Sequence, residues 1–134
     1  MVTTKSVFPI FFLLVFNLFG VGCGTSPTAS YTNVAVEDFK VRMQAVDVIV
    51  LDVRTPAETA QGIISNAQQL NFHAADFKTQ LAELDQDKTY LVYCKSGGRS
   101  SSTCEMMVAM GFTEVINLEG GYTAWSAWNK SKPD

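Results

Sequence analysis

The chain has 134 residues, of which 47 % are hydrophobic and 17 % are charged, and its formal net charge is −3. This length and composition fit one folded domain and exclude a disordered chain. The acidic balance, without any block of basic residues, excludes nucleic acid as an expected partner. An anion would have to be bound locally, by backbone N–H groups and one or two cations.

Residues 1–22 predict a signal peptide. One lysine, Lys5, precedes an apolar run over residues 7–19, which is shorter than the roughly 20 residues of a membrane-spanning helix. The run ends in GVGCG, which resembles the cleavage site of bacterial lipoproteins, where the cysteine, here Cys23, becomes the lipidated first residue. Residues 23–33 are predicted to be a lipidated tether. An uncleaved anchor and a cut elsewhere are the alternatives; under all three the domain is exported or membrane-tethered, in the periplasm or another extracytoplasmic space.

The remaining domain, predicted over residues 34–130, alternates helices and strands. Short loops between alternating elements predict an α/β fold with a mostly parallel sheet. In such sheets, ligands bind beyond the carboxyl ends of the strands. Helices are expected over residues 36–44, 76–84, 99–111 and 120–128, with a short one starting at Pro56 after Thr55 as its N-cap. Strands are expected over residues 47–53, 89–93 and 114–118, with a short one within residues 66–72.

The segment CKSGGRS, residues 94–100, joins the third strand to the third long helix. Its glycines let successive N–H groups curl around a guest, and the following helix points its positive end at the same place. Lys95 and Arg99 add positive charge. Cys94 is therefore expected to have a lowered pKa and to act as a thiolate nucleophile without a separate base.

Three alternatives to that reading of Cys94 stay open. The segment could be an ordinary glycine turn, Cys104 could resolve Cys94 as a disulfide, or His73 could form a Cys–His pair. The apolar stripe of its helix favours Cys104 as a buried, inert thiol. No pair of cysteines has metal-ligand spacing, so we expect no metal.

Four segments resemble, in order and spacing, a single-domain rhodanese, a sulfurtransferase: DVRTPAETAQG, CKSGGRS, GF and EGGYTAW. The resemblance covers residues 34–128. It implies a three-layer α/β fold with a five-stranded parallel sheet and helices on both faces. It also implies that Cys94 carries sulfur as a persulfide. The terminal sulfur would be bound by the backbone amides of the next six residues, Lys95, Ser96, Gly97, Gly98, Arg99 and Ser100.

The implied reaction is sulfur transfer in two steps. The thiolate attacks the outer sulfur of a small anionic donor such as thiosulfate, sulfite leaves, and a thiol or cyanide then accepts the sulfur. Phosphatases on the same architecture have five residues between cysteine and arginine, whereas four separate Cys94 from Arg99 here. The smaller ring favours a single sulfur atom over a phosphoryl group. A non-catalytic sulfur-relay or binding module is the alternative function; no cofactor is implied, and we expect a monomer.

Three residues at or shortly after the end of the strand expected over residues 47–53 are predicted to support the site. The resemblance places Asp52 and Arg54 beside the CKSGGRS segment, which we call the active loop. Asp52 is expected to accept hydrogen bonds that hold the loop in shape, and Arg54 to pair with Glu58 four residues later. The Gly-His-Ile usual in the family is Gly-Ile-Ile over residues 62–64 of this chain, so the imidazole is absent.

Overall fold

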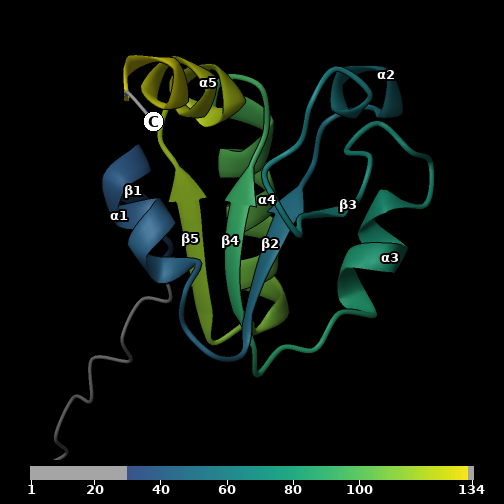
Figure 1. Ribbon diagram of the computed structural model, residues 1–134. Helices are drawn as coiled ribbons and strands as arrows, with labels where there is room; N and C mark the ends of the chain where they lie inside the picture. Colours follow the sequence, from purple (N-terminus) through teal and green to yellow (C-terminus); the bar gives the residue numbers. More distant parts are fainter. Residues whose placement is uncertain (1–29, 133–134) are drawn as a thin grey trace, which may run out of the picture.

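The computed structural model describes residues 30–132 (Figure 1). The predicted signal peptide, its lipidation residue Cys23 and most of the predicted tether lie outside the described residues. Within the described part of the chain, no helix is both long and apolar enough to cross a membrane.

A five-stranded parallel sheet with the order β1-β5-β4-β2-β3 forms the centre of the domain. Strand β4 lies in the middle and pairs with β2 and β5, so all three central strands carry side chains that are buried on both faces. This confirms the predicted α/β fold and its sheet. The strands are β1 (Thr32–Val34), β2 (Val48–Asp52), β3 (Gln68–Gln69), β4 (Thr89–Tyr93) and β5 (Glu114–Leu118).

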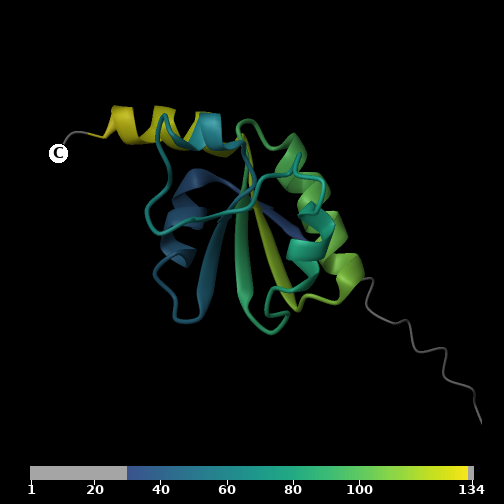
Figure 2. The same ribbon diagram turned by 90° about the vertical axis from the view of Figure 1, so that its right-hand side faces the viewer.

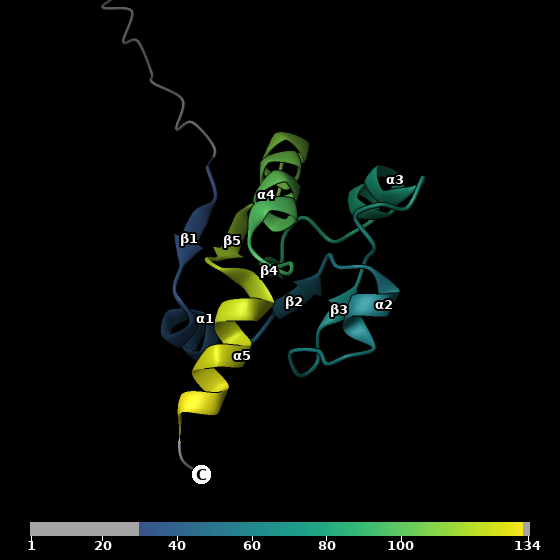
Figure 3. The same cartoon turned by 90° about the horizontal axis from the view of Figure 1, so that it is seen from above.

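Helices cover both faces of the sheet, as the resemblance implies (Figure 2). Alternation along β4 divides the core: Tyr90 and Val92 face α3 and α4, whereas Leu91 and Tyr93 face α1 and α5. Helices α2 and α5 both lie at the end of the sheet where its central parallel strands end (Figure 1 and Figure 3). The helices are α1 (Val36–Arg42), α2 (Pro56–Thr59), α3 (Phe77–Ala82), α4 (Gly98–Met110) and α5 (Gly121–Ser131).

Local sequence signals set the ends of the helices near the site. Thr55 caps α2 through a reciprocal capping box with Glu58, and Pro56 occupies the first turn, as predicted. Gly97 precedes α4 and Gly111 ends it, both with left-handed backbone conformations. The turns at Thr55 and Gly97 fix where α2 and α4 begin. Helix α4 begins within the CKSGGRS segment, and Glu58 of α2 contacts Arg99 of the same segment.

The edge strand β1 differs from the sequence prediction, which places Thr32 and Asn33 in the tether. In the structure these residues pair with Ile116 and Asn117 of β5, and Asn117 Nδ2 donates a hydrogen bond of 2.8 Å to Asn33 Oδ1. Two of the three β1 residues are exposed, so the strand lacks the apolar run by which a buried strand is recognised. The short strand predicted within residues 66–72 is present as β3, which is two residues long.

Candidate active site

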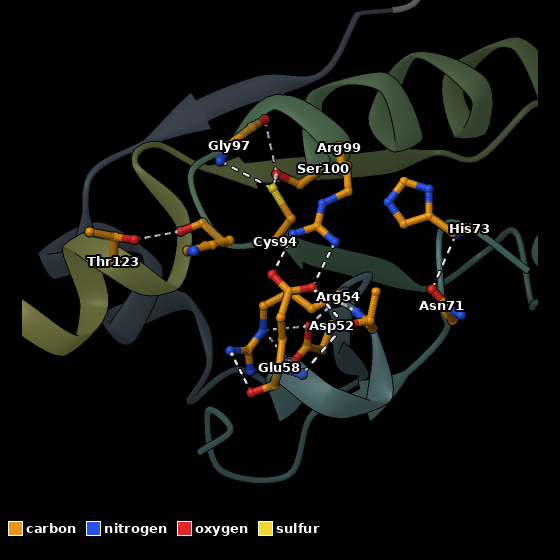
Figure 4. Close-up of polar contacts among 12 residues, drawn as sticks. Asp52, Arg54, Glu58, Asn71, His73, Cys94, Gly97, Arg99, Ser100 and Thr123 are labelled. Atoms are coloured by element: carbon orange, nitrogen blue, oxygen red, sulfur yellow. Dashed lines mark hydrogen bonds and ion pairs between the residues drawn. The ribbon is translucent and has the colours of Figure 1, made fainter. Parts of the chain in front are cut away.

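The CKSGGRS segment forms a tight loop between the carboxyl end of β4 and the start of α4 (Figure 4). Gly97 adopts a φ of 105°, which a residue with a Cβ rarely adopts, and this turns its N–H toward the cysteine. The Gly97 N–H donates to Cys94 Sγ at 3.1 Å, and the Ser100 hydroxyl lies 3.4 Å from the same sulfur. The Ser100 hydroxyl also reaches the Gly97 carbonyl at 3.1 Å. Its single proton favours the sulfur once Cys94 is ionised, because a charged acceptor binds it more strongly.

These donors decide the ionisation of Cys94. Burial alone raises the pKa of the thiol, because the charged form loses its hydration. Hydrogen bonds from the Ser100 hydroxyl and from the N–H groups of Ser100, Gly97 and Ser96 outweigh that effect, so the pKa lies below its ordinary value. The lowered pKa agrees with the predicted acidic thiol. Its main cause is the set of hydrogen-bond donors in the loop.

The sulfur lies at the bottom of the loop. Cys94 is 1 % exposed, whereas its neighbours Lys95, Ser96 and Gly98 are exposed to solvent. A small sulfur donor must therefore enter the loop, or displace the side chains beside it, to reach Cys94 Sγ. Of the six residues predicted to bind a second sulfur, Ser96, Gly97 and Ser100 direct donors at Sγ.

Arg99 connects the loop to α2 through an ion pair with Glu58. Its Nη1 and Nη2 lie 2.8 and 2.7 Å from the two carboxylate oxygens. The same carboxylate accepts hydrogen bonds from the Thr55 N–H and hydroxyl at 3.0 and 2.9 Å. The bond from Arg99, partly opposed by burial and helped by Thr55, holds the pKa of Glu58 far below its ordinary value.

The predicted pairing of Arg54 with Glu58 is wrong. The Arg54 guanidinium turns back to Asp52, with Nη2 and Nε at 2.7 and 3.0 Å from the two carboxylate oxygens. Of Glu58 it reaches only the backbone carbonyl, at 3.5 Å, and it donates a shorter hydrogen bond of 2.7 Å to the Gly62 carbonyl. The reason is that α2 begins at Pro56, so Arg54 lies outside the helix and its side chain does not share a helical face with Glu58.

Asp52 also differs from its predicted role, because no hydrogen bond among the described residues joins its carboxylate to the CKSGGRS loop. The carboxylate instead accepts from Arg54 and from the Tyr93 hydroxyl, the latter at 2.6 Å. Asp52 and Arg54 are 0 and 2 % exposed, and burial raises the pKa of Tyr93. The three side chains form a buried polar cluster where β2 and β4 end side by side, at the residue before Cys94.

The start of α5 holds the loop from the other side. The N–H groups of Tyr122 and Thr123 donate to the carbonyls of Cys94 and Lys95 at 2.8 and 3.0 Å. Gly121 has a φ of 56°, and a Cβ at this position would lie 2.5 Å from the Cys94 carbonyl oxygen. Sequence reasoning assigned no role in the loop to Tyr122 and Thr123. The signal was present in the GG pair before them, since a glycine is needed where two backbones meet this closely.

Two of the alternatives for Cys94, the pair with His73 and the disulfide with Cys104, find no support in the structure. His73 is exposed in the turn after β3, its backbone N–H donates to Asn71, and within residues 30–132 no hydrogen bond joins it to Cys94. Cys104 is fully buried, and burial raises its pKa to about 12. Both cysteines are free thiols, which confirms the predicted buried thiol at Cys104. Over the same residues, no group of three or more histidine, cysteine or acidic side chains is placed to hold a metal ion.

Residues 35–127 match the family described as the rhodanese-like domain. A protein named sulfurtransferase from Allochromatium vinosum is 41 % identical over 80 residues, which cover 60 % of this chain and 73 % of that protein. The thiosulfate sulfurtransferase GlpE of Pseudomonas putida is 36 % identical over 80 residues, covering 59 % of this chain and 70 % of that protein.

Solved structures agree with the sequence matches. A rhodanese-related protein from Thermoplasma volcanium superposes with a TM-score of 0.64 and 28 % identity, covering 77 % of this chain and 96 % of that one. A rhodanese-like domain protein from Staphylococcus aureus gives 0.62 and 29 % identity, covering 70 % of this chain and 90 % of that one. The match over residues 35–127, the parallel sheet and the position of CKSGGRS after its central strand all agree: this chain belongs to the rhodanese-like domain family.

Proposed function

We propose that this protein is a sulfurtransferase that moves sulfane sulfur from an anionic donor such as thiosulfate to a thiophilic acceptor through a persulfide on Cys94. The observation that carries the proposal is the contact of Cys94 Sγ with the Gly97 N–H at 3.1 Å and the Ser100 hydroxyl at 3.4 Å. Relatives named as sulfurtransferases support the activity at the level of the family.

The loop donors suit the charge that each step places on sulfur. In the first step the Cys94 thiolate attacks the outer sulfur of thiosulfate, a new S–S bond forms, and the old S–S bond breaks to release sulfite with its electron pair. The enzyme is left as a persulfide anion, Cys94–S–S⁻. Preorganised N–H and O–H donors stabilise this anion without reorganising, as an oxyanion hole does for oxygen.

In the second step an acceptor such as cyanide or a thiolate attacks the outer sulfur, and Cys94 Sγ leaves as a thiolate. No proton has to be removed from Cys94 in either step if the thiol is already ionised. This fits a site in which no histidine or carboxylate among the described residues bonds to the sulfur.

A thiosulfate-to-cyanide assay separates the enzyme from a non-catalytic relay or binding module. Thiocyanate should form with the wild-type protein and with Cys104→Ala, and should be lost in Cys94→Ser. A folded wild-type protein with reduced Cys94 and no thiocyanate formation would overturn the enzymatic proposal and favour the module. Cys104→Ala is the matched control because it removes the other thiol of the folded domain, which lies in the core.

We also propose that the protein is exported and lipid-anchored through Cys23. The support is the order of lysine, apolar run and GVGCG in the sequence. Expression in a bacterial host with a radiolabelled fatty acid should label the wild-type protein and leave Cys23→Ala unlabelled. Equal labelling of both proteins, or of neither, would contradict the proposal.

A further inference from the structure

A cleft of about 550 Å³ opens beside the active loop, between α2 and α5. Figure 1 shows both helices above the end of the sheet at which its central strands end. Lys95 of the loop lines the cleft, and the Thr123 hydroxyl that also lines it donates to the Lys95 carbonyl at 2.9 Å. The cleft and the sulfur-binding loop therefore share a wall.

The cleft carries uncompensated positive charge. Two of its charged side chains are already paired, Arg54 with Asp52 and Glu58 with Arg99. The other two are Lys95 and Lys130, and neither forms an ion pair with any residue between 30 and 132. Two free ammonium groups stand out in a chain with a net charge of −3 and favour an anionic ligand.

The size and lining of the cleft indicate an organic ligand. Thiosulfate or cyanide would fill only a small part of about 550 Å³, a volume within the range of roughly 300–1,000 Å³ typical of sites for small organic molecules. The Tyr122 ring and Ala127 offer apolar contact, and Thr123 and Ser126 offer hydroxyls. The ligand would thus combine an apolar part, hydrogen-bonding groups and negative charge.

The geometry points to the site of the sulfur acceptor: a low-molecular-weight thiol that bears a carboxylate, which Lys95 and Lys130 bind. This inference rests on the proposed sulfurtransferase function. The bound thiolate attacks the outer sulfur of the Cys94 persulfide, forming R–S–S⁻, and the S–S bond to Cys94 breaks with its electrons on Sγ. One sulfur atom moves, the total charge is conserved, and no outside oxidant or reductant is required.

The test compares two nearly isosteric thiols, N-acetylcysteine, which carries a carboxylate, and N-acetylcysteinamide, which does not. Both are offered to the purified protein with thiosulfate as donor, and rates are expressed per thiolate because the two thiols differ in pKa. We expect the KM of N-acetylcysteine (the acid) to be about tenfold below that of N-acetylcysteinamide (the amide). The reason is that only the acid can form two partly exposed ion pairs, with Lys95 and Lys130. N-acetylalanine, which has no sulfur, should compete with the acid.

A matched pair of lysine variants locates the contact. Lys130→Gln should raise the KM of N-acetylcysteine about threefold, because it removes one of the two contacts that together make the tenfold difference. The KM of the amide should stay unchanged and serves as the internal reference. Lys132→Gln removes the same charge two residues away, from a side chain that lies 5.2 Å from the Trp128 ring and outside the cleft. It should change neither KM.

Turnover with cyanide keeps the two proposals distinguishable. If cyanide is an acceptor but the acid and the amide have equal KM values, or Lys130→Gln behaves as Lys132→Gln does, the inference is overturned and the sulfurtransferase function stands. If cyanide is an acceptor and neither thiol is, the inference is also overturned, and a protein thiol becomes the expected acceptor. If the folded protein transfers no sulfur even to cyanide, the proposed function fails and the inference fails with it.

Discussion

Glu58 and Arg99, which are 41 residues apart in the chain, meet through two contacts of 2.8 and 2.7 Å and join helix α2 to the loop that holds Cys94. The capping box with Thr55 fixes the Glu58 side chain before it reaches the loop. The start of α2 and the active loop therefore form one hydrogen-bonded unit.

Glu58→Gln should lower the free energy of unfolding by about 1 kcal/mol at pH 7, because it weakens this partly exposed pair and its cap. Folding lowers the pKa of Glu58, so its contribution is complete above the ordinary glutamate value near 4.3 and is lost as pH falls through the folded value. The difference between wild type and variant should narrow below about pH 4. Urea unfolding at pH 7 and pH 3 measures this; Glu105→Gln, at an exposed position of α4, is the control. A difference that stays constant with pH contradicts the assignment.

Ser100→Ala should raise the pKa of Cys94 by about one unit, since it removes one hydrogen bond to the ionised sulfur. The rise in the rate of iodoacetamide alkylation with pH should move to higher pH by the same amount. Ser102→Ala alters an exposed serine on the same helix and should leave the profile in place. An unchanged profile in Ser100→Ala would show that the backbone N–H groups alone set the pKa.

Gly121→Ala should destabilise the domain by at least about 2 kcal/mol and lower its Tm by about 10 °C. The new Cβ would lie 2.5 Å from the Cys94 carbonyl oxygen, at a φ of 56°. Gly98→Ala is the matched control, since a Cβ there meets nothing within 4 Å and the residue lies in the first turn of α4. Its Tm should stay the same or rise slightly. Thermal unfolding of both variants measures the difference. Equal Tm values would contradict the close approach of Gly121 to the Cys94 carbonyl.

Asp52→Ala should cost about 3–5 kcal/mol, because it leaves the Arg54 guanidinium buried without its counter-charge and Tyr93 without its acceptor. Asp38→Ala removes an aspartate whose ion pair with Arg42 is exposed, and should cost less than about 1 kcal/mol. Urea titration of both variants provides the comparison. A small loss in Asp52→Ala would mean that the buried cluster contributes little to the stability of the domain.

The sequence was sufficient to predict what local spacing controls. The strand before Cys94, the glycine turn after it and the helix that follows are all encoded within 22 consecutive residues, 89–110, and the structure confirms each of them. The fold class followed from the alternation of elements, and the resemblance added the number of strands.

The parts that were missed depend on contacts between distant residues. The spacing of Arg54 and Glu58 suggests an ion pair only if both lie in one helix, and the start of α2 at Pro56 separates them. The true partner of Glu58 is 41 positions away, and no local pattern reports it. Strand β1 was missed because an exposed edge strand of three residues carries too little hydrophobic signal.

The measurement that tests the central claim most directly is the intact mass of the protein after exposure to thiosulfate, followed by tryptic mapping. Trypsin cuts after Lys88, Lys95 and Arg99, so Cys94 and Cys104 fall in different peptides. The account predicts a gain of one sulfur atom on the peptide of residues 89–95, its removal by reductant, and no gain in Cys94→Ser. No gain in the folded wild-type protein, or a gain carried by the Cys104 peptide, would contradict it.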